Sequence, residues 1–128
     1  MKKILIVDDS AFMRSVLMDL LTKLPDGHTL IEPVEIFEAD GKQNALKQIK
    51  SNKPDVILLD VVMKDSETEG LQLIDDIKNI IDPKKIIMVS SVGQNELINA
   101  CKDRGVLMYL HKPFEQEQVI KAINSILT

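Results

Sequence analysis

The sequence lacks most of the features that mark secreted, membrane-spanning and nucleic-acid-binding proteins. It has one cysteine, which excludes an internal disulfide and agrees with the reducing cytoplasm. None of its apolar stretches approaches the length that crosses a membrane, and the apolar run at the N-terminus turns acidic too soon for a signal peptide. The formal net charge of −4 leaves no overall basic footprint for nucleic acid. We therefore expect a cytoplasmic protein that contacts neither membrane nor nucleic acid directly.

The apolar content is sufficient for one domain of ordinary size. The chain has 128 residues, of which 45% are hydrophobic, so it can bury a real core and is not a disordered segment. We find no internal repeat, low-complexity stretch or interdomain linker, and nothing follows the last expected helix. The sequence therefore predicts a single domain over residues 1–128, without an attached output domain.

Strand-like and helix-like segments alternate along the whole chain. The expected strands cover residues 3–7, 34–38, 56–59, 86–89 and 106–110. Four of them are continuous apolar runs, as in strands covered on both faces, whereas the second alternates and adjoins Pro33, which suits an edge strand. This alternation predicts an α/β fold, a doubly wound parallel sheet of five strands with helices on both faces.

Apolar stripes with helical spacing lie between and after the expected strands. The first expected helix carries the longest stripe, which consists of Phe12, Met13, Val16, Leu17, Leu20, Leu21 and Leu24. The later helices carry shorter stripes, which are Ala45, Leu46 and Ile49; Leu71, Ile74, Ile77 and Ile81; Leu97, Ile98 and Cys101; and Val119, Ile120, Ile123 and Leu127.

Polar side chains follow four of the apolar runs. Asp8 and Asp9 end the first run, Asp60 the third, Ser90 the fourth and Lys112 the fifth. Because ligands of open α/β sheets bind beyond the carboxyl ends of the strands, we expect these side chains to meet at one edge. Clustered carboxylates repel one another unless a cation holds them. A divalent hard metal with oxygen ligands is the natural cation, and Lys112 is the second.

The segments that carry these residues resemble the receiver domain of two-component response regulators, and in particular the single-domain chemotaxis regulators. The segments are Ile6-Val7-Asp8-Asp9-Ser10, Leu58-Leu59-Asp60-Val61-Val62-Met63, Met88-Val89-Ser90-Ser91 and Lys112-Pro113-Phe114. The resemblance runs through essentially the whole chain. It implies a flavodoxin-like sheet in the strand order 2-1-3-4-5, and a histidine kinase that passes a phosphoryl group to one aspartate.

The resemblance implies a role for each residue of the cluster. Asp60 would accept the phosphoryl group, and Lys112 would pair first with Asp60 and then with the phosphoryl oxygens. Asp8, Asp9 and Asp60 would bind Mg²⁺ together with the backbone carbonyl of Val62. The peptide bond between Lys112 and the proline after it resembles the family's cis peptide, an isomer that proline permits.

The resemblance also implies a switch and partners. Ser90 would donate its hydroxyl to a phosphoryl oxygen, and Tyr109 would change rotamer in response. The donor would be a sensor histidine kinase or a phosphotransfer protein. A downstream protein would then bind the face built by the fourth helix, fifth strand and fifth helix, which covers residues 95–104, 106–110 and 116–121.

Two other functions stay open on the sequence alone. Haloacid-dehalogenase-type phosphohydrolases also use a strand-end aspartate and Mg²⁺, but they need an Asp-x-Asp pair where this chain has Asp8 and Asp9 side by side. A flavodoxin-like cofactor binder would need a Ser/Thr/Gly loop that cradles phosphate after the first strand, where acidic residues stand instead. Asp9 or Ser10 also suits the N-cap of the first helix.

Several residues have ordinary structural interpretations. Tyr109 alone suits packing at a strand edge, and Cys101 suits a helix–sheet interface. His28 falls in a turn and is expected in solvent, and His111 has no Cys or His partner at metal-ligand spacing, so neither is expected to transfer phosphoryl groups. The loops at residues 24–33 and 64–69 are longer than is usual in the receiver-domain family that the sequence resembles.

Overall fold

A five-stranded parallel sheet organises the molecule. The computed structural model describes residues 1–24, 30, 32–63, 68–91 and 93–128. The strands follow the order β2-β1-β3-β4-β5, with β1 over Lys2–Val7, β2 over Val34–Ala39, β3 over Val56–Asp60, β4 over Ile86–Ser90 and β5 over Met108–His111. The predicted flavodoxin-like fold and strand order are therefore confirmed.

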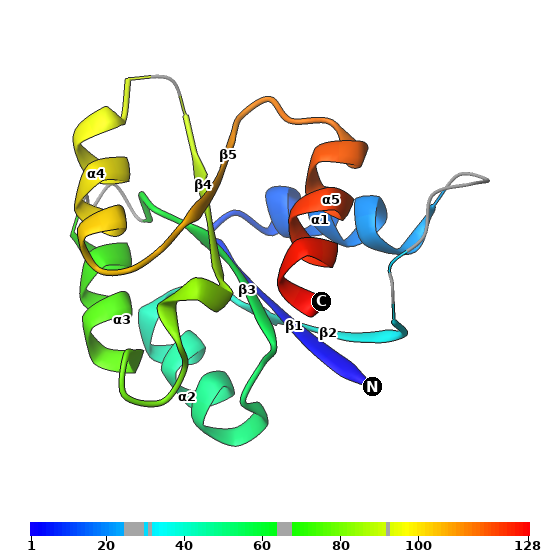
Figure 1. Ribbon diagram of the computed structural model, residues 1–128, viewed down its shortest axis with the longest axis horizontal. Helices are drawn as coiled ribbons and strands as arrows, with labels where there is room; N and C mark the ends of the chain where they lie inside the picture. Colours follow the sequence, from blue (N-terminus) through cyan, green and yellow to red (C-terminus); the bar gives the residue numbers. More distant parts are fainter. Residues whose placement is uncertain (25–29, 31, 64–67, 92) are drawn as a thin grey trace.

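Helices cover both faces of the sheet (Figure 1). Their bounds are α1 at Ala11–Thr22, α2 at Lys42–Asn52, α3 at Glu69–Ile77, α4 at Asn95–Asp103 and α5 at Gln116–Leu127, with a short 3-10 turn at Pro83–Lys85. Helices α2, α3 and α4 pack on one face and α1 and α5 on the other, so the sheet separates two apolar layers. Among the described residues, the helices fall short of the length and apolar character that a membrane span requires.

The strand patterns explain this arrangement. All five residues of β3 and all five of β4 are buried, as expected for central strands covered on both sides. The predicted edge strand is confirmed as β2: Val34 and Ile36 pack in the layer of α1 and α5, while Phe37 packs in the opposite layer. Cys101 is fully buried in the α4 layer, as predicted, and burial raises the pKa of its thiol to about 11.

The prediction for the first helix is wrong at its ends. Phe12 is 75% exposed, because the first turn of α1 lies at the carboxyl edge of the sheet, beside the site and away from the core. The buried face of α1 consists of Leu17 and Leu21, and the helix ends at Thr22, before Leu24. Similarly, α3 ends at Ile77, although Ile81 in the following turn is buried as expected.

Strand boundaries also differ from the prediction near the site. The fifth strand begins at Met108 because Val106 belongs to the turn that closes α4. In that turn, Gly105 has a φ of +97° and the N–H of Val106 donates to the carbonyl of Cys101. Asp60 and Ser90 are the last residues of β3 and β4, and not the residues after them. His28 and most of the two longer loops lie outside the described residues.

Gly70 in the first turn of α3 fixes the backbone that follows the third strand. A Cβ at this position would lie 2.6 Å from the carbonyl oxygen of Val61, which is backbone and cannot rotate away. This close approach holds α3 against the residue directly after Asp60. The position of the aspartate therefore depends on a glycine ten residues away in the sequence.

We expect Gly70→Ala to lower the free energy of unfolding by about 1–3 kcal/mol, because the added methyl must push the backbone apart. Urea unfolding followed by circular dichroism measures the change. Ser51→Ala, at an exposed position of α2, is the control and should leave stability nearly unchanged. Equal stability of Gly70→Ala and the parent protein would contradict the close contact.

Candidate functional site

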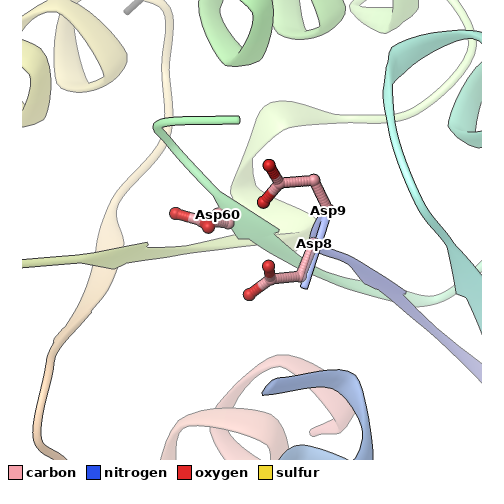
Figure 2. Close-up of side chains that lie close together, drawn as sticks. All are labelled: Asp8, Asp9 and Asp60. Carbon is pink, nitrogen blue, oxygen red and sulfur yellow. The ribbon is translucent and has the colours of Figure 1, made fainter. Parts of the chain in front are cut away.

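Three carboxylates converge at the carboxyl edge of the sheet (Figure 2). Asp8 and Asp9 directly follow β1, and Asp60 ends the neighbouring strand β3. One oxygen of each carboxylate lies within 4.8 Å of the others. The juxtaposition predicted from the strand ends is therefore present, and it follows from the parallel pairing of β1 with β3.

Asp8 is buried and only partly paired. It is 2% exposed, and its Oδ1 accepts a hydrogen bond of 2.8 Å from the N–H of Ser10. Its other oxygen, Oδ2, is buried and finds no donor among the described residues. A buried carboxylate oxygen without a donor, beside two further carboxylates, fits a hard cation with oxygen ligands such as Mg²⁺.

Asp60 lies between a backbone N–H and an ammonium group. Its Oδ1 accepts a hydrogen bond of 3.3 Å from the N–H of Val62, and its Oδ2 lies 3.6 Å from the Nζ of Lys112. The residue is 8% exposed and thus largely buried. The two contacts hold the carboxylate in a defined orientation.

The electrostatics of the cluster oppose ionisation. Burial, and after it the charge of Asp8, raises the pKa of Asp60 to about 6, although Lys112 and the Val62 N–H act in the opposite direction. Burial also raises the pKa of Asp8, against the hydrogen bond from Ser10 and the charge of Lys112. Ionisation of Asp8 and Asp60 near neutral pH therefore costs free energy. A bound cation would lower this cost.

Lys112 and Ser90 lie at the carboxyl ends of adjacent strands. The N–H of Lys112 donates to the carbonyl of Ser90 over 2.7 Å, which joins the end of β5 to the end of β4. The peptide bond between Lys112 and Pro113 is cis, as the resemblance implied. The hydroxyl of Ser90 lies 3.4 Å from the Nδ1 of His111. Tyr109 is 42% exposed on the outer side of β5 and lies apart from the carboxylates.

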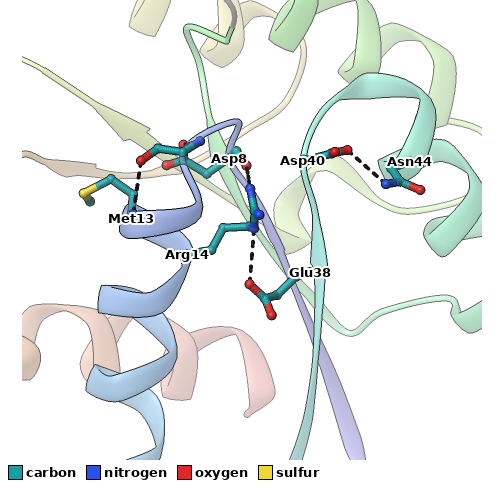
Figure 3. A network of polar contacts seen from close by, with 7 residues as sticks. Asp8, Met13, Arg14, Glu38, Asp40 and Asn44 are labelled. Carbon is teal, nitrogen blue, oxygen red and sulfur yellow. Dashed lines mark hydrogen bonds and ion pairs between the residues drawn. The ribbon is translucent and has the colours of Figure 1, made fainter.

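Sequence reasoning missed Arg14, which supports the turn at Asp8 and Asp9 from α1. Its Nη1 donates to the backbone carbonyl of Asp8 over 2.6 Å, and its Nε lies 3.2 Å from Oε1 of Glu38 on β2 (Figure 3). Ser10 is the N-cap of α1, as proposed, and its hydroxyl accepts from the N–H of Met13. The sequence did contain a signal for this contact, because Arg14 lies about one turn into a helix that begins just after Asp8 and Asp9.

Comparison with known proteins places the chain in a family. The sequence pattern of the response regulator receiver domain matches residues 4–124. The chain is 34% identical over 125 residues to the chemotaxis protein CheY of Bacillus subtilis, covering 98% of this chain and 97% of that protein. It is 29% identical to the sporulation initiation phosphotransferase F of the same organism, covering 98% and 94%. The chain therefore belongs to the receiver domains of two-component response regulators, a family of signalling switches.

Solved structures agree with this assignment. The receiver domain of NtrX from Brucella abortus matches with a TM-score of 0.79 at 29% identity, covering 97% of each chain. The chemotaxis protein CheY4 of Vibrio cholerae matches with a TM-score of 0.80 at 25% identity, covering 98% of each chain. The family assignment supports the predicted signalling function, whereas neither alternative, phosphohydrolase nor flavin binder, gains support.

The raised pKa of Asp60 predicts a pH-dependent stability. The folded protein holds a proton on Asp60 up to about pH 6, whereas the unfolded chain releases it near 3.8, so stability falls as the pH rises through this window. Without Mg²⁺ at pH 7.5, Asp60→Asn should therefore raise the free energy of unfolding by on the order of 1–3 kcal/mol. This gain in the free energy of unfolding should become smaller toward pH 4. Urea unfolding at pH 7.5 and at pH 4 measures it.

The exposed carboxylate of Asp103 supplies the control, since Asp103→Asn should change stability little at either pH. Addition of Mg²⁺ should stabilise the parent protein more than Asp60→Asn, because the ion relieves the carboxylate repulsion. A gain from Asp60→Asn that is equally large at pH 4 and pH 7.5 would contradict a titrating cluster.

Proposed function

We propose that this receiver domain accepts a phosphoryl group on Asp60 in the presence of Mg²⁺ and changes its partner-binding face in response. The observation that carries the proposal is the Asp60 carboxylate, which lies beside the ammonium of Lys112 at 3.6 Å and shares a cluster with Asp8 and Asp9. The chain would catalyse only its own phosphorylation and dephosphorylation, and no reaction on a separate substrate.

The reaction needs an ionised carboxylate and charge stabilisation. A carboxylate oxygen of Asp60 forms a bond to phosphorus while the bond from phosphorus to the donor breaks, and the electron pair leaves with the donor. Lys112 compensates the charge on the phosphoryl oxygens, and Ser90 donates its hydroxyl to one of them. The Val62 N–H already bonds Oδ1, which leaves the other edge of the carboxylate for attack.

Asp8, Asp9 and Asp60 would hold Mg²⁺, together with the backbone carbonyl of Val62. The fit rests on the oxygen-only donor set and on the buried oxygen of Asp8 that lacks a donor among the described residues. When bound, Mg²⁺ neutralises part of the charge that develops on the phosphoryl oxygens. Arg14 would keep the Asp8 backbone in place through its bond to the carbonyl oxygen.

The family assignment supports a proposal for the partners. We infer that the phosphodonor is a sensor histidine kinase or a phosphotransfer protein, and that a downstream protein binds the face formed by α4, β5 and α5. Two side chains of this face, Leu107 and Tyr109, are exposed by 63% and 42%. Exposed apolar and aromatic groups of this kind are common anchors of protein interfaces, and Tyr109 would act as the switch residue.

Asp60→Asn should abolish phosphorylation by acetyl phosphate, because the amide cannot attack phosphorus. Asp9→Asn or chelation of Mg²⁺ should lower it strongly. Intact-protein mass spectrometry, which detects the added phosphoryl group, measures both effects. Asp103→Asn is the matched control and should be labelled like the parent protein. Persistent labelling of a well-folded Asp60→Asn variant would overturn the assignment of the acceptor.

The lifetime of the phosphorylated form should be long. In receiver domains, the residues two past the acceptor and two past the serine influence how water reaches the phosphoryl group, and here these are Val62 and Val92. Val62 is half-buried, and Val92 lies outside the described residues. Neither side chain can orient a water molecule by a hydrogen bond. The double variant Val62→Asn, Val92→Glu should therefore lose its phosphoryl group faster after donor removal.

The measurement is the decay of the phosphorylated mass after the donor is removed, compared between the parent and the double variant. Both proteins are first brought to the same extent of labelling, so that only the loss differs. A double variant that decays no faster than the parent would contradict the proposed shielding and direct attention to the loop at residues 64–69.

A further inference from the structure

The hydroxyl of Ser90 has a neighbour that the proposed switch does not include. The register of β4 and β5 places Ser90 opposite His111, and the Ser90 Oγ lies 3.4 Å from the Nδ1 of His111. Ser90 is 1% exposed, so its hydroxyl needs a partner inside the protein. With the ring proton on Nε2, the imidazole accepts this hydrogen bond at Nδ1.

His111 also contacts the switch residue. Tyr109 lies two positions earlier on the same strand, so both side chains project from the same side of β5. Their ring centroids are 5.0 Å apart with an angle of 76° between the planes, an edge-to-face contact. The Nζ of Lys102 on α4 lies 4.9 Å from the centroid of the Tyr109 ring. A continuous series of contacts thus runs from Ser90 through His111 and Tyr109 to α4.

We propose that His111 is a positioning residue of the switch. It holds the Ser90 hydroxyl away from the phosphoryl site in the unphosphorylated protein, and it links release of that hydroxyl to Tyr109. This inference rests on the proposed function, since it assigns a regulator to the same site. Sequence reasoning assigned no role to His111, although it directly precedes Lys112.

The Ser90 hydroxyl cannot bond His111 and a phosphoryl oxygen at the same time. Serine has one hydroxyl proton, so Ser90 donates either to Nδ1 of His111 or to a phosphoryl oxygen, and not to both. At 3.4 Å the bond to His111 is long, so a charged phosphoryl oxygen competes with it successfully. When the hydroxyl leaves, the imidazole loses its partner, and the edge contact that positions Tyr109 changes with it. His111 therefore opposes activation by a modest amount.

Two substitutions separate the two contacts of the imidazole. His111→Phe keeps an aromatic ring beside Tyr109 but removes the acceptor for Ser90. His111→Asn removes the ring but keeps an acceptor oxygen near the position of Nδ1. The probe is beryllofluoride with Mg²⁺, a phosphoryl mimic, titrated into the full chain. The fluorescence of Tyr109, the only tyrosine in a chain without tryptophan, reports binding.

His111→Phe should bind the mimic about two- to fivefold more tightly than the parent, the range expected when a weak net hydrogen bond no longer competes. His111→Asn should bind with nearly the parent's affinity, although the amplitude of the Tyr109 signal should change because the ring is absent. In a Ser90→Ala background, His111→Phe should have no further effect on affinity, because the two residues act through one bond. Urea unfolding should show similar stability for both His111 variants.

Three results would overturn the proposal. The first is that His111→Phe binds beryllofluoride with the same affinity as the parent protein. The second is that His111→Phe and His111→Asn increase this affinity equally. The third is a gain from His111→Phe that persists in the Ser90→Ala background. Failure of the parent protein to bind beryllofluoride with Mg²⁺ would instead remove the proposed function, and this inference with it. If the parent protein binds beryllofluoride and the His111 variants bind it with the same affinity, only the role of His111 is contradicted, and the proposed function stands.

Discussion

Two buried carboxylates beside one ammonium are the interaction on which the rest of this structure depends. Asp8 and Asp60 are 2% and 8% exposed, and the Nζ of Lys112 lies 3.6 Å from an oxygen of Asp60. Burial raises the pKa of both carboxyl groups, and a neighbouring aspartate raises each further, Asp9 for Asp8 and Asp8 for Asp60. The folded chain therefore holds a charge arrangement in which ionisation of the carboxylates is unfavourable unless a cation compensates it. The proposed function depends on this arrangement.

The sheet keeps this arrangement in place. The central strands β1, β3 and β4 carry the acidic residues and the serine at their carboxyl ends, and their own side chains are buried in two apolar layers. Arg14 and Gly70 support the turns that follow β1 and β3. In contrast, β5 is an edge strand with four residues and two exposed side chains. The buried central strands thus position the acidic residues, and the edge strand is exposed to solvent.

Much of the fold was predictable because its signals are local. Continuous apolar runs identified the central strands β1, β3 and β4, and alternation beside a proline identified β2 as an edge. The same interpretation was wrong for β5, whose apolar run forms the other edge and leaves Tyr109 exposed. The wrong predictions share a cause. Phe12 continues an apolar stripe, but the first turn of α1 extends to the carboxyl edge, where the core ends. Val106 has a strand-like neighbourhood, but Gly105 takes a positive φ and closes α4 instead. Periodicity alone contains no information about where a helix leaves the sheet.

By itself, the sequence determined which chemical groups stand at the strand ends: three carboxylates, a serine and a lysine, each after an apolar run. Parallel pairing then made their meeting predictable. Only the tertiary structure decided the distances and the environment that make these groups reactive. The contact between Ser90 and His111 depends on the register of β4 with β5, and the pKa of Asp60 depends on burial by residues distant in the chain. Register and burial are properties of the packed molecule, because they arise from contacts between segments that sequence spacing does not relate.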